Sequence, residues 1–445
     1  MSAVIGALYA LLVIAGAVSA LGLAVACLRK WPVLGLYLVG LFVLVAWEIP
    51  VPINVIAAGG LQIKAEDVIV LILAVDTVLS PERLLTVTRR RNPLMVWLAV
   101  CLGVVVVGSL LIFGSSALNE ARPLIWGIVC TSWFLNHDWE DAKLQQQFQK
   151  WVALIGWGLT SIFCYHAAKY GLGSADSFVS VGINSGIEQT QTGRPLVSGQ
   201  AMTLACLGFI LFTGKPRQGW RLVSGLVFIL TAMACQHRSV WAAVAVATVF
   251  GLSRLRGSFL HHSIFWGAYS LIILGGLALA GVFDPLAESL SYSLSSSGTY
   301  REREGSWQLL VGQVLDKGPG TVAFGSPYGS GYDRVVDGVF VTYSPHNWYV
   351  IIFLRMGLFG LIGYVALLLS ISVNLLARRE WVAASSFFGI VIYCWAYALP
   401  WYITPVFGWC AFRAWRGLPS SGRLRPKLKY VSPAYKHLSQ ASTRS

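Results

Sequence analysis

Long apolar stretches separated by short polar ones run along most of the chain, and their length predicts membrane-spanning helices. A helix needs about 20 apolar residues to cross a bilayer, and fewer where its polar ends reach the interface. Stretches of that length, or close to it, cover 3–27, 31–48, 68–80, 94–113, 121–135, 151–169, 199–213, 221–235, 239–252, 263–282, 347–376, 382–399 and 402–412. Because several are short, we predict an all-α polytopic membrane protein with 12 or 13 transmembrane helices.

The composition agrees with this interpretation. Hydrophobic residues make up 56% of the 445 residues and charged residues only 12%, whereas a soluble globular chain carries about 25% charged residues. Too little polar surface is left to cover several water-soluble cores, which excludes a string of soluble domains.

The formal net charge of +14 follows the predicted topology. Most Lys and Arg residues fall in alternate loops and in the 417–445 tail, and cytoplasmic loops carry an excess of these residues. The tail is therefore expected inside, while the choice between 12 and 13 helices leaves the side of the N-terminus open. Anionic membrane lipids are the expected partners of this charge, and no nucleic acid is needed to explain it.

The loops divide the chain into five parts. These are N-terminal helices (1–169), central helices with an outer loop at 170–198 (170–283), a large outer loop (284–346), C-terminal helices (347–416) and a basic cytoplasmic tail (417–445). Long ordered loops are usually functional. The predicted helices contain few ionisable groups apart from Asp76, His166 and Arg355, and this scarcity argues against a secondary transporter. We therefore expect the activity at the outer face.

Arginine dominates the bases expected on that face. Its planar guanidinium binds phosphate oxygens in pairs and stays charged when partly buried, so several outer Arg residues indicate a phosphate-bearing lipid. Pairing of these residues with the outer acids is the alternative, and it stays open for each Arg. No CxxC, HExxH or Asp-rich loop is present, and the eight cysteines lie within or beside apolar stretches. The sequence thus predicts no metal site, no cofactor and no disulfide framework.

One amphipathic helix is expected in the large loop. Trp307 begins a helical repeat of apolar residues that continues through Leu310, Val311, Val314 and Leu315. At about 100° per residue, Arg303 falls in the middle of this apolar face and Arg301 points about 160° away from it. A buried Arg needs an anionic partner, which could be Glu304, Asp333 or a pyrophosphate. We therefore prefer Arg303 to Arg301 as a site residue.

The large loop ends at His346, immediately before a long apolar helix. The dipole at a helix N-terminus disfavours imidazolium, and a neutral imidazole can accept a proton from a hydroxyl group. A capping or interfacial role for His346 is the alternative. Arg355, about 13 Å further along the helix, faces away from His346, so we expect it to form a structural pair inside the bundle.

Two further arginines lie close to the expected outer membrane plane. Arg238 falls in a tight turn between two apolar stretches, and Arg194 immediately precedes the stretch that starts near Gly199. Both positions suit a lipid pyrophosphate.

These residues, in this order, resemble the O-antigen ligase / O-antigen polymerase superfamily (WaaL and Wzy types). The likeness covers about 190–375 and rests on Arg303 with Trp307, Gly318-Pro319-Gly320, His346-Asn347, Gly357-Leu358-Phe359-Gly360 and the upstream turn His237-Arg238-Ser239-Val240-Trp241. The turn after Arg194 departs from the family pattern, and Arg355 stands where the family often has Glu.

The resemblance implies a metal-independent, inverting glycosyltransferase in the bacterial inner membrane, with its active site on the periplasmic side and its C-terminus in the cytoplasm. It would move a glycan from undecaprenyl pyrophosphate to an acceptor hydroxyl, in the ligase case that of lipid A-core. Carried over by position, Arg238 and Arg303 would hold the pyrophosphate and His346 would be the base, while Arg194, Arg301, Trp307 and Asn347 would contact substrate. A Wzy-type polymerase that extends a growing polysaccharide remains an alternative, as do a protein-directed oligosaccharyltransferase and, from another class, a lipid-linked glycan transporter.

Overall fold

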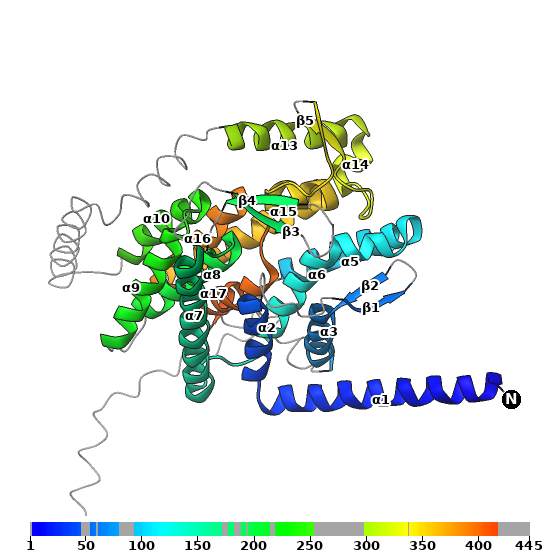
Figure 1. Cartoon of the computed structure of the whole chain (residues 1–445), viewed down its shortest axis with the longest axis horizontal. Helices are drawn as coiled ribbons and strands as arrows, with labels where there is room; N and C mark the ends of the chain where they lie inside the picture. Colours follow the sequence, from blue (N-terminus) through cyan, green and yellow to red (C-terminus); the bar gives the residue numbers. More distant parts are fainter. Residues whose placement is uncertain are drawn as a thin grey trace, which may run out of the picture.

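The chain folds into a bundle of helices with a smaller helical layer along one side (Figure 1). The computed structural model describes residues 2–45, 54–58, 61–79, 93–170, 177–181, 188–192, 195–213, 219–252, 298–336 and 338–416. The predicted helix at 263–282, residues 284–297 of the predicted large loop, and the 417–445 tail lie outside the described residues.

Each predicted apolar stretch within the described residues forms a helix. The N-terminal part contributes α1 (Ser2–Lys30), α2 (Val33–Val45), α3 (Ala65–Val78), α5 (Pro93–Phe113), α6 (Ser115–Leu135) and α7 (Ala142–Tyr170). The rest of the bundle is formed by α8 (Ser198–Thr213), α9 (Gly219–Ala234), α10 (Arg238–Leu252), α15 (Trp348–Ala377), α16 (Trp381–Ala396), the 3-10 turn η1 (Trp401–Ile403) and α17 (Thr404–Trp415). The expected helical character is confirmed.

Three of the described helices are long and apolar enough to cross a bilayer, namely α5, α7 and α15. A fourth span results if α1 and α2, which are bent by 108° at their junction, are counted together. Helices α8, α9, α10 and α16 are apolar but shorter. The protein is therefore membrane-embedded, while the total of 12 or 13 spans stays a prediction.

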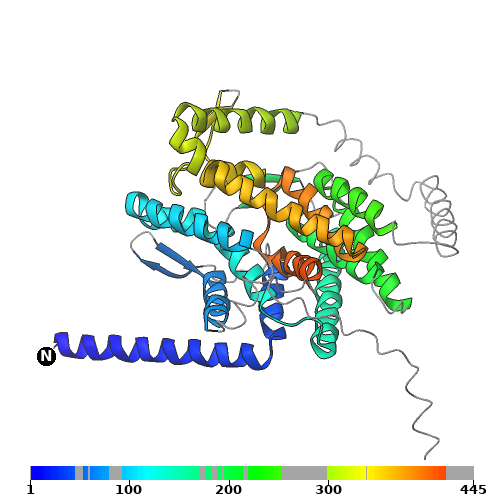
Figure 2. The ribbon, with the colours of Figure 1, turned by 180° about the vertical axis from the view of Figure 1, so that it is seen from behind.

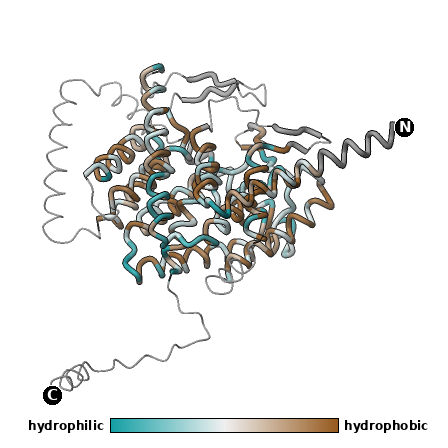
Figure 3. Tube along the Cα trace, turned by 90° about the horizontal axis from the view of Figure 1, so that it is seen from below, coloured by the Kyte–Doolittle hydropathy of each residue, from teal (hydrophilic) through white to brown (hydrophobic). Residues whose placement is uncertain are grey.

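Large apolar side chains are also exposed on the bundle, and Figure 3 shows that hydrophobic residues, in brown, run along most of its helices. On α5, Leu111 is 85% exposed and Val104 is 68% exposed. Exposure of such an apolar surface to water along a long helix would be unfavourable, whereas lipid chains solvate it. The inward faces pack small residues closely, and a side chain at Gly225 would overlap α8.

The described part of the large loop forms a layer on the bundle. Its elements are α13 (Gly298–Asp316), α14 (Pro319–Phe324), β5 (Arg334–Val336) and β6 (Val339–Val341). Figures 1 and 2 show α13 running along one side of the molecule, with α1 along the opposite side. Leu310 and Val314 of α13 pack against Leu354 of α15 and against Tyr332. An amphipathic helix in this loop is thus present, although Leu315, expected on its buried face, is 55% exposed.

Three antiparallel hairpins add short strands to a fold expected to be all-α. They are β1 (Asn54–Ala58) with β2 (Leu61–Lys64), β3 (Ser177–Val181) with β4 (Glu188–Thr192), and β5 with β6. In the third hairpin, Val336 pairs with Val339 around a two-residue Asp-Gly connection, the dipeptide most favoured in tight hairpins. Gly338 adopts the positive φ of 80° that such a turn requires.

A glycine contact joins the loop to a kink in α15. Gly357 has φ 61° and interrupts the helix, and Gly325, after α14, has φ 85°. A Cβ at either position would overlap the backbone of the other segment. The kink frees the Leu354 carbonyl, which accepts the Ser326 N–H at 2.7 Å. Gly325 and Gly357 therefore allow the backbone of the loop to contact the backbone of α15 directly.

Arg355 is held in this junction by many partners, as expected for a structural pair. It is 2% exposed and forms an ion pair with Glu120 of α6. Its guanidinium also donates to the Pro327 carbonyl at 3.0 Å, to the Ser330 hydroxyl at 2.6 Å and to the Gly331 carbonyl. Glu120 in turn accepts the Gly329 N–H at 2.6 Å.

We expect the Arg355–Glu120 pair to control the stability of the loop. Removing one partner of a buried ion pair leaves an uncompensated charge and costs about 3–5 kcal/mol. Arg355→Met should therefore lower the thermal unfolding temperature of the purified full-length protein and open 325–336 to proteolysis. The double variant Arg355→Met/Glu120→Gln should lose less than the sum of the single variants, and exposed Lys143→Met is the control. Additive losses would show that the two side chains do not act as a pair.

Candidate anion-binding site

An arginine from each of two separate elements converges on His346 where α15 begins. Arg303 comes from α13 and Arg334 from β5. Tyr397 lies beyond the end of α16, and its ring centroid is 5.6 Å from that of His346. Tyr343 contacts the other side of the cluster, with ring centroids 5.8 Å from His346. The site thus joins the large loop to the C-terminal helices.

Arg303 faces the bundle, as its position in the apolar repeat predicted. Its guanidinium carbon lies 5.1 Å from the centroid of the Tyr397 ring, and one Nη approaches the Ala396 carbonyl at 3.5 Å. A cation over an aromatic face gains only modest electrostatic energy. Glu304 and Asp333 were the side chains expected to compensate this charge, yet neither forms an ion pair with Arg303. Both acids are exposed.

Arg334 is the more deeply buried cation, with 4% of its surface exposed. Its Nε donates to the Ser306 hydroxyl, and one Nη donates to the carbonyls of Tyr332 and Tyr343 at 2.8 Å each. In the part of the chain that the structure describes, no carboxylate forms an ion pair with Arg303 or Arg334. The two guanidinium groups therefore make this region electropositive.

His346 is neutral in this environment. Burial lowers its pKa to about 4, and the positive charges of Arg303 and Arg334 contribute in the same direction. A neutral imidazole has a free lone pair on one ring nitrogen and can accept a proton. The arrangement combines an anion-binding surface with an adjacent proton acceptor.

Asn347 and Trp307, which are predicted to contact substrate, have structural roles in the described fold. Asn347 is 1% exposed, and its side-chain oxygen caps α15 by accepting the Val350 N–H at 3.1 Å. The cap fixes where the helix starts and so orients His346. Trp307 is 8% exposed and packs edge-to-face on Trp395, with centroids 6.3 Å apart. Helix capping and packing of α13 against the bundle account for the burial of both residues, and their contact with substrate stays a prediction.

The turn that carries Arg238 lies at the same end of the bundle. Arg238 is exposed at the first position of α10. Its neighbour His237 is buried and binds the Leu196 carbonyl at 2.8 Å. Just beyond Leu196, the Ser198 hydroxyl contacts the Tyr393 hydroxyl at 3.0 Å. The Tyr393 ring stacks on that of Tyr397, so the turn and the site share one packed unit.

The side chains of two predicted site residues lie outside the part of the chain that the structure describes. Arg194 lies outside the described residues, and Arg301 is described only as part of the backbone of α13. The assignments of both remain predictions.

The sequence reasoning missed Arg334 and Tyr397. Arg334 reaches the site because the β5–β6 hairpin pairs it with Val341, and the Asp-Gly connection was the available signal for that hairpin. Tyr397 carries no local signal, since it follows an apolar helix and meets Arg303 only through packing. Among the described residues, no group of three or more His, Cys, Asp or Glu side chains gathers as metal ligands, and all eight cysteines are free thiols.

No known protein-family profile matches the chain, and no curated protein sequence shows significant similarity to it.

We expect the protonation of His346 to depend on Arg303. In the wild-type protein the imidazole should stay neutral down to a pH near 4, and Arg303→Gln should raise its pKa because one opposing charge is removed. NMR of ¹³C-histidine-labelled full-length protein would follow the titration, with the signal assigned by its loss in His346→Gln. Arg301→Gln, a change of the same charge on the same helix, is the control. A wild-type His346 that titrates near its ordinary value of 6.5 would contradict the expected effect of burial and of the two arginines.

Proposed function

We propose that the protein is a membrane glycosyltransferase that moves a glycan from undecaprenyl pyrophosphate to an acceptor hydroxyl, as an O-antigen ligase does. The observation that carries this proposal is the convergence of Arg303 and Arg334, neither paired with a carboxylate among the described residues, on neutral His346. Such a site favours an anionic leaving group beside a proton-donating nucleophile. The motif order that resembles the ligase and polymerase superfamily supports the same chemistry.

In the proposed reaction, Arg303 and Arg334 bind the pyrophosphate of the donor. The oxygen of the acceptor hydroxyl attacks the anomeric carbon from the face opposite the pyrophosphate. His346 accepts the proton of this hydroxyl during the attack. The bond between the anomeric carbon and the pyrophosphate oxygen breaks, and the leaving group keeps the electron pair. Guanidinium groups stabilise the charge that accumulates on that oxygen. Attack from the opposite face inverts the anomeric configuration.

The same arginines link base strength to donor binding. They lower the pKa of His346 in the free protein, which makes the imidazole a weak base. An anionic pyrophosphate between them would offset their charge and raise that pKa toward the value at which a base is effective. His346 would then become a competent base only when the donor is in place.

The membrane-embedded bundle suits a lipid-linked donor. The site lies where α15 begins and α16 ends, so a polyprenyl tail could remain among the exposed apolar helices while its pyrophosphate reaches Arg303. The basic residues of the opposite end favour the cytoplasm for that end. We therefore place the site at the periplasmic face of the bacterial inner membrane, with the C-terminus in the cytoplasm. Arg194 and Arg238 are proposed to extend the contact with the pyrophosphate.

A transfer assay tests the proposed function. Purified full-length protein would receive undecaprenyl-pyrophosphate-linked glycan in EDTA, with and without lipid A-core. We expect one acceptor-bound product, a loss of about 10²–10⁴-fold in rate for His346→Ala, and about 10²–10³-fold for Arg303→Ala. Lys317→Ala, which removes a charge from an exposed position just after α13, is the control and should retain most activity.

The products separate the related activities. A ladder of lengthening chains without added lipid A-core would identify a Wzy-type polymerase. Absence of transfer under both conditions would contradict a transferase. Activity that survives Arg303→Ala but not Arg301→Ala would contradict the placement of the anion site.

The pH dependence of the transfer rate should report the pKa of His346 in two states, the free protein and the donor complex. His346 acts only when deprotonated, so activity is present above its pKa and is lost as the pH falls through it. The acid limb of kcat/KM, which reflects the free protein, should lie near pH 4, and that of kcat, which reflects the donor complex, should lie higher. Initial rates at varied donor concentration from pH 3.5 to pH 8, an interval set at about this width to bracket both limbs, would give both profiles. Coincident limbs would argue against the coupling.

A further inference from the structure

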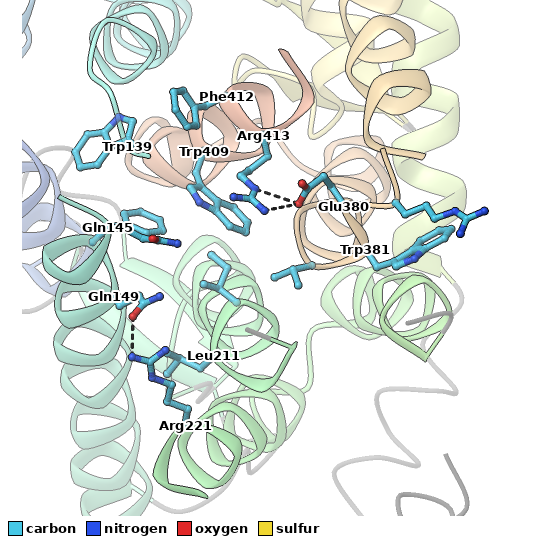
Figure 4. A pocket seen from close by; sticks show the side chains of 14 residues that line it. Trp139, Gln145, Gln149, Leu211, Arg221, Glu380, Trp381, Trp409, Phe412 and Arg413 are labelled. Atoms are coloured by element: carbon cyan, nitrogen blue, oxygen red, sulfur yellow. Dashed lines mark hydrogen bonds and ion pairs between the residues drawn. The ribbon is translucent and has the colours of Figure 1, made fainter. Parts of the chain in front are cut away.

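A pocket lined by both charged and aromatic side chains lies at the end of the bundle opposite His346. It has a volume of about 320 Å³ and lies between the first turns of α7, the last turn of α8, the start of α9, the α15–α16 turn and the last turns of α17 (Figure 4). His346 precedes α15 and Arg379 follows it, so this long helix separates the two sites. The volume is within the range of small-molecule sites, which is about 300–1,000 Å³.

Arginine again dominates the lining. Arg221, Arg379 and Arg413 line the pocket, and Glu380 is the one carboxylate among its lining residues. Glu380 is already shared, because it accepts from Arg413 at 2.6 Å and from Arg416 at 2.7 Å. The pocket therefore keeps a net positive charge after its one acid is counted.

Arg221 supplies the clearest sign of a missing partner. One Nη donates to the Gln149 side chain at 2.7 Å, while its Nε is buried without a hydrogen-bond partner among the described residues. Figure 4 shows Arg221 and Arg413 entering from different sides of the pocket, with Trp409 beside Arg413 and Gln149 beside Arg221. A buried guanidinium N–H left unsatisfied is costly, and an anionic oxygen in the pocket would satisfy it.

Arg379 is held at the pocket by an unusual backbone. Helix α15 ends with the Arg379 N–H bonded to the Leu376 carbonyl at 3.0 Å and the Glu380 N–H bonded to the Leu375 carbonyl at 2.9 Å. This ending normally places glycine in the left-handed position, but here Arg379 has φ 55°. The chain thus keeps a cation at a position where backbone energy favours glycine.

The remaining wall is aromatic. Trp139, Phe148, Trp381, Trp409 and Phe412 line the pocket beside the arginines. Tryptophan is favoured where a membrane protein meets the headgroup region, and basic pockets between membrane helices bind lipid phosphates. A ligand with a phosphate and an apolar part matches both surfaces.

We propose that this pocket binds a phosphate ester, the group carried by anionic phospholipid headgroups, between Arg221, Arg379 and Arg413. The site is separate from the proposed transfer site and does not depend on that function. Aromatic walls favour the lipid as the source of the phosphate, and a soluble phosphate ester is the second source that carries the same group.

Native mass spectrometry of the full-length protein in detergent would measure binding of dioleoylphosphatidylglycerol, which is anionic. Dioleoylphosphatidylcholine is the zwitterionic comparison, because its choline cation offsets the charge of the same phosphate ester. We expect the wild-type protein to prefer phosphatidylglycerol. Arg221→Gln and Arg379→Gln should each weaken that binding about fivefold, the effect expected for one basic residue near an anionic lipid. Lys150→Gln is the matched control, since Lys150 is exposed on α7 and does not line the pocket.

Competition with soluble glycerol 3-phosphate identifies the source of the phosphate. Displacement of the lipid by it would show that the phosphate ester alone suffices, whereas binding of phosphatidylglycerol only would assign the site to lipid. Equal binding of the two lipids to the wild-type protein would overturn the proposal without any variant. An equal loss in Lys150→Gln and in the pocket variants would also overturn it, because general surface charge would then explain the binding.

Discussion

The buried ion pair between Arg355 and Glu120 determines where the large loop sits on the helical bundle. Arg355 comes from α15 and Glu120 from α6, and the backbone from Pro327 to Gly331 wraps around both. An isolated charge at this depth would be very unfavourable, so the three segments are stable only together. The reciprocal contact of Gly325 and Gly357 adds a backbone approach that no other residue type permits.

The candidate site depends on that junction. Arg334 and His346 follow the wrapped segment in the chain, and Arg303 precedes it on α13. These three residues belong to different elements of the chain. They therefore come together only through tertiary packing. Their shared electrostatics follow from the placement. Burial, together with the charges of the two arginines, lowers the pKa of His346, and the same two charges favour an anion nearby.

Charge is distributed differently at the two ends of the bundle. Near His346, the arginines contact carbonyls, hydroxyls and aromatic rings. At the opposite end, Glu380 binds Arg413 and Arg416, and Asp76 binds Arg29 at 3.3 Å. Ion pairing thus neutralises part of the charge around Glu380 and Asp76, whereas Arg303 and Arg334 have no carboxylate partner among the described residues. Both ends use arginine because its charge persists on partial burial.

The sequence by itself determined the apolar helices, the preference for Arg303 over Arg301 on the bundle-facing side, and the position of His346 at a helix start. Each of these features depends on the local periodicity of apolar residues or on one adjacent helix end. Such signals are contained within a few helical turns of sequence. Tertiary structure alone decided that Arg334 and Tyr397 join His346 and that Arg355 pairs with Glu120. These contacts join residues far apart in the chain, and their energy depends on burial and distance, which exist only once the helices have packed.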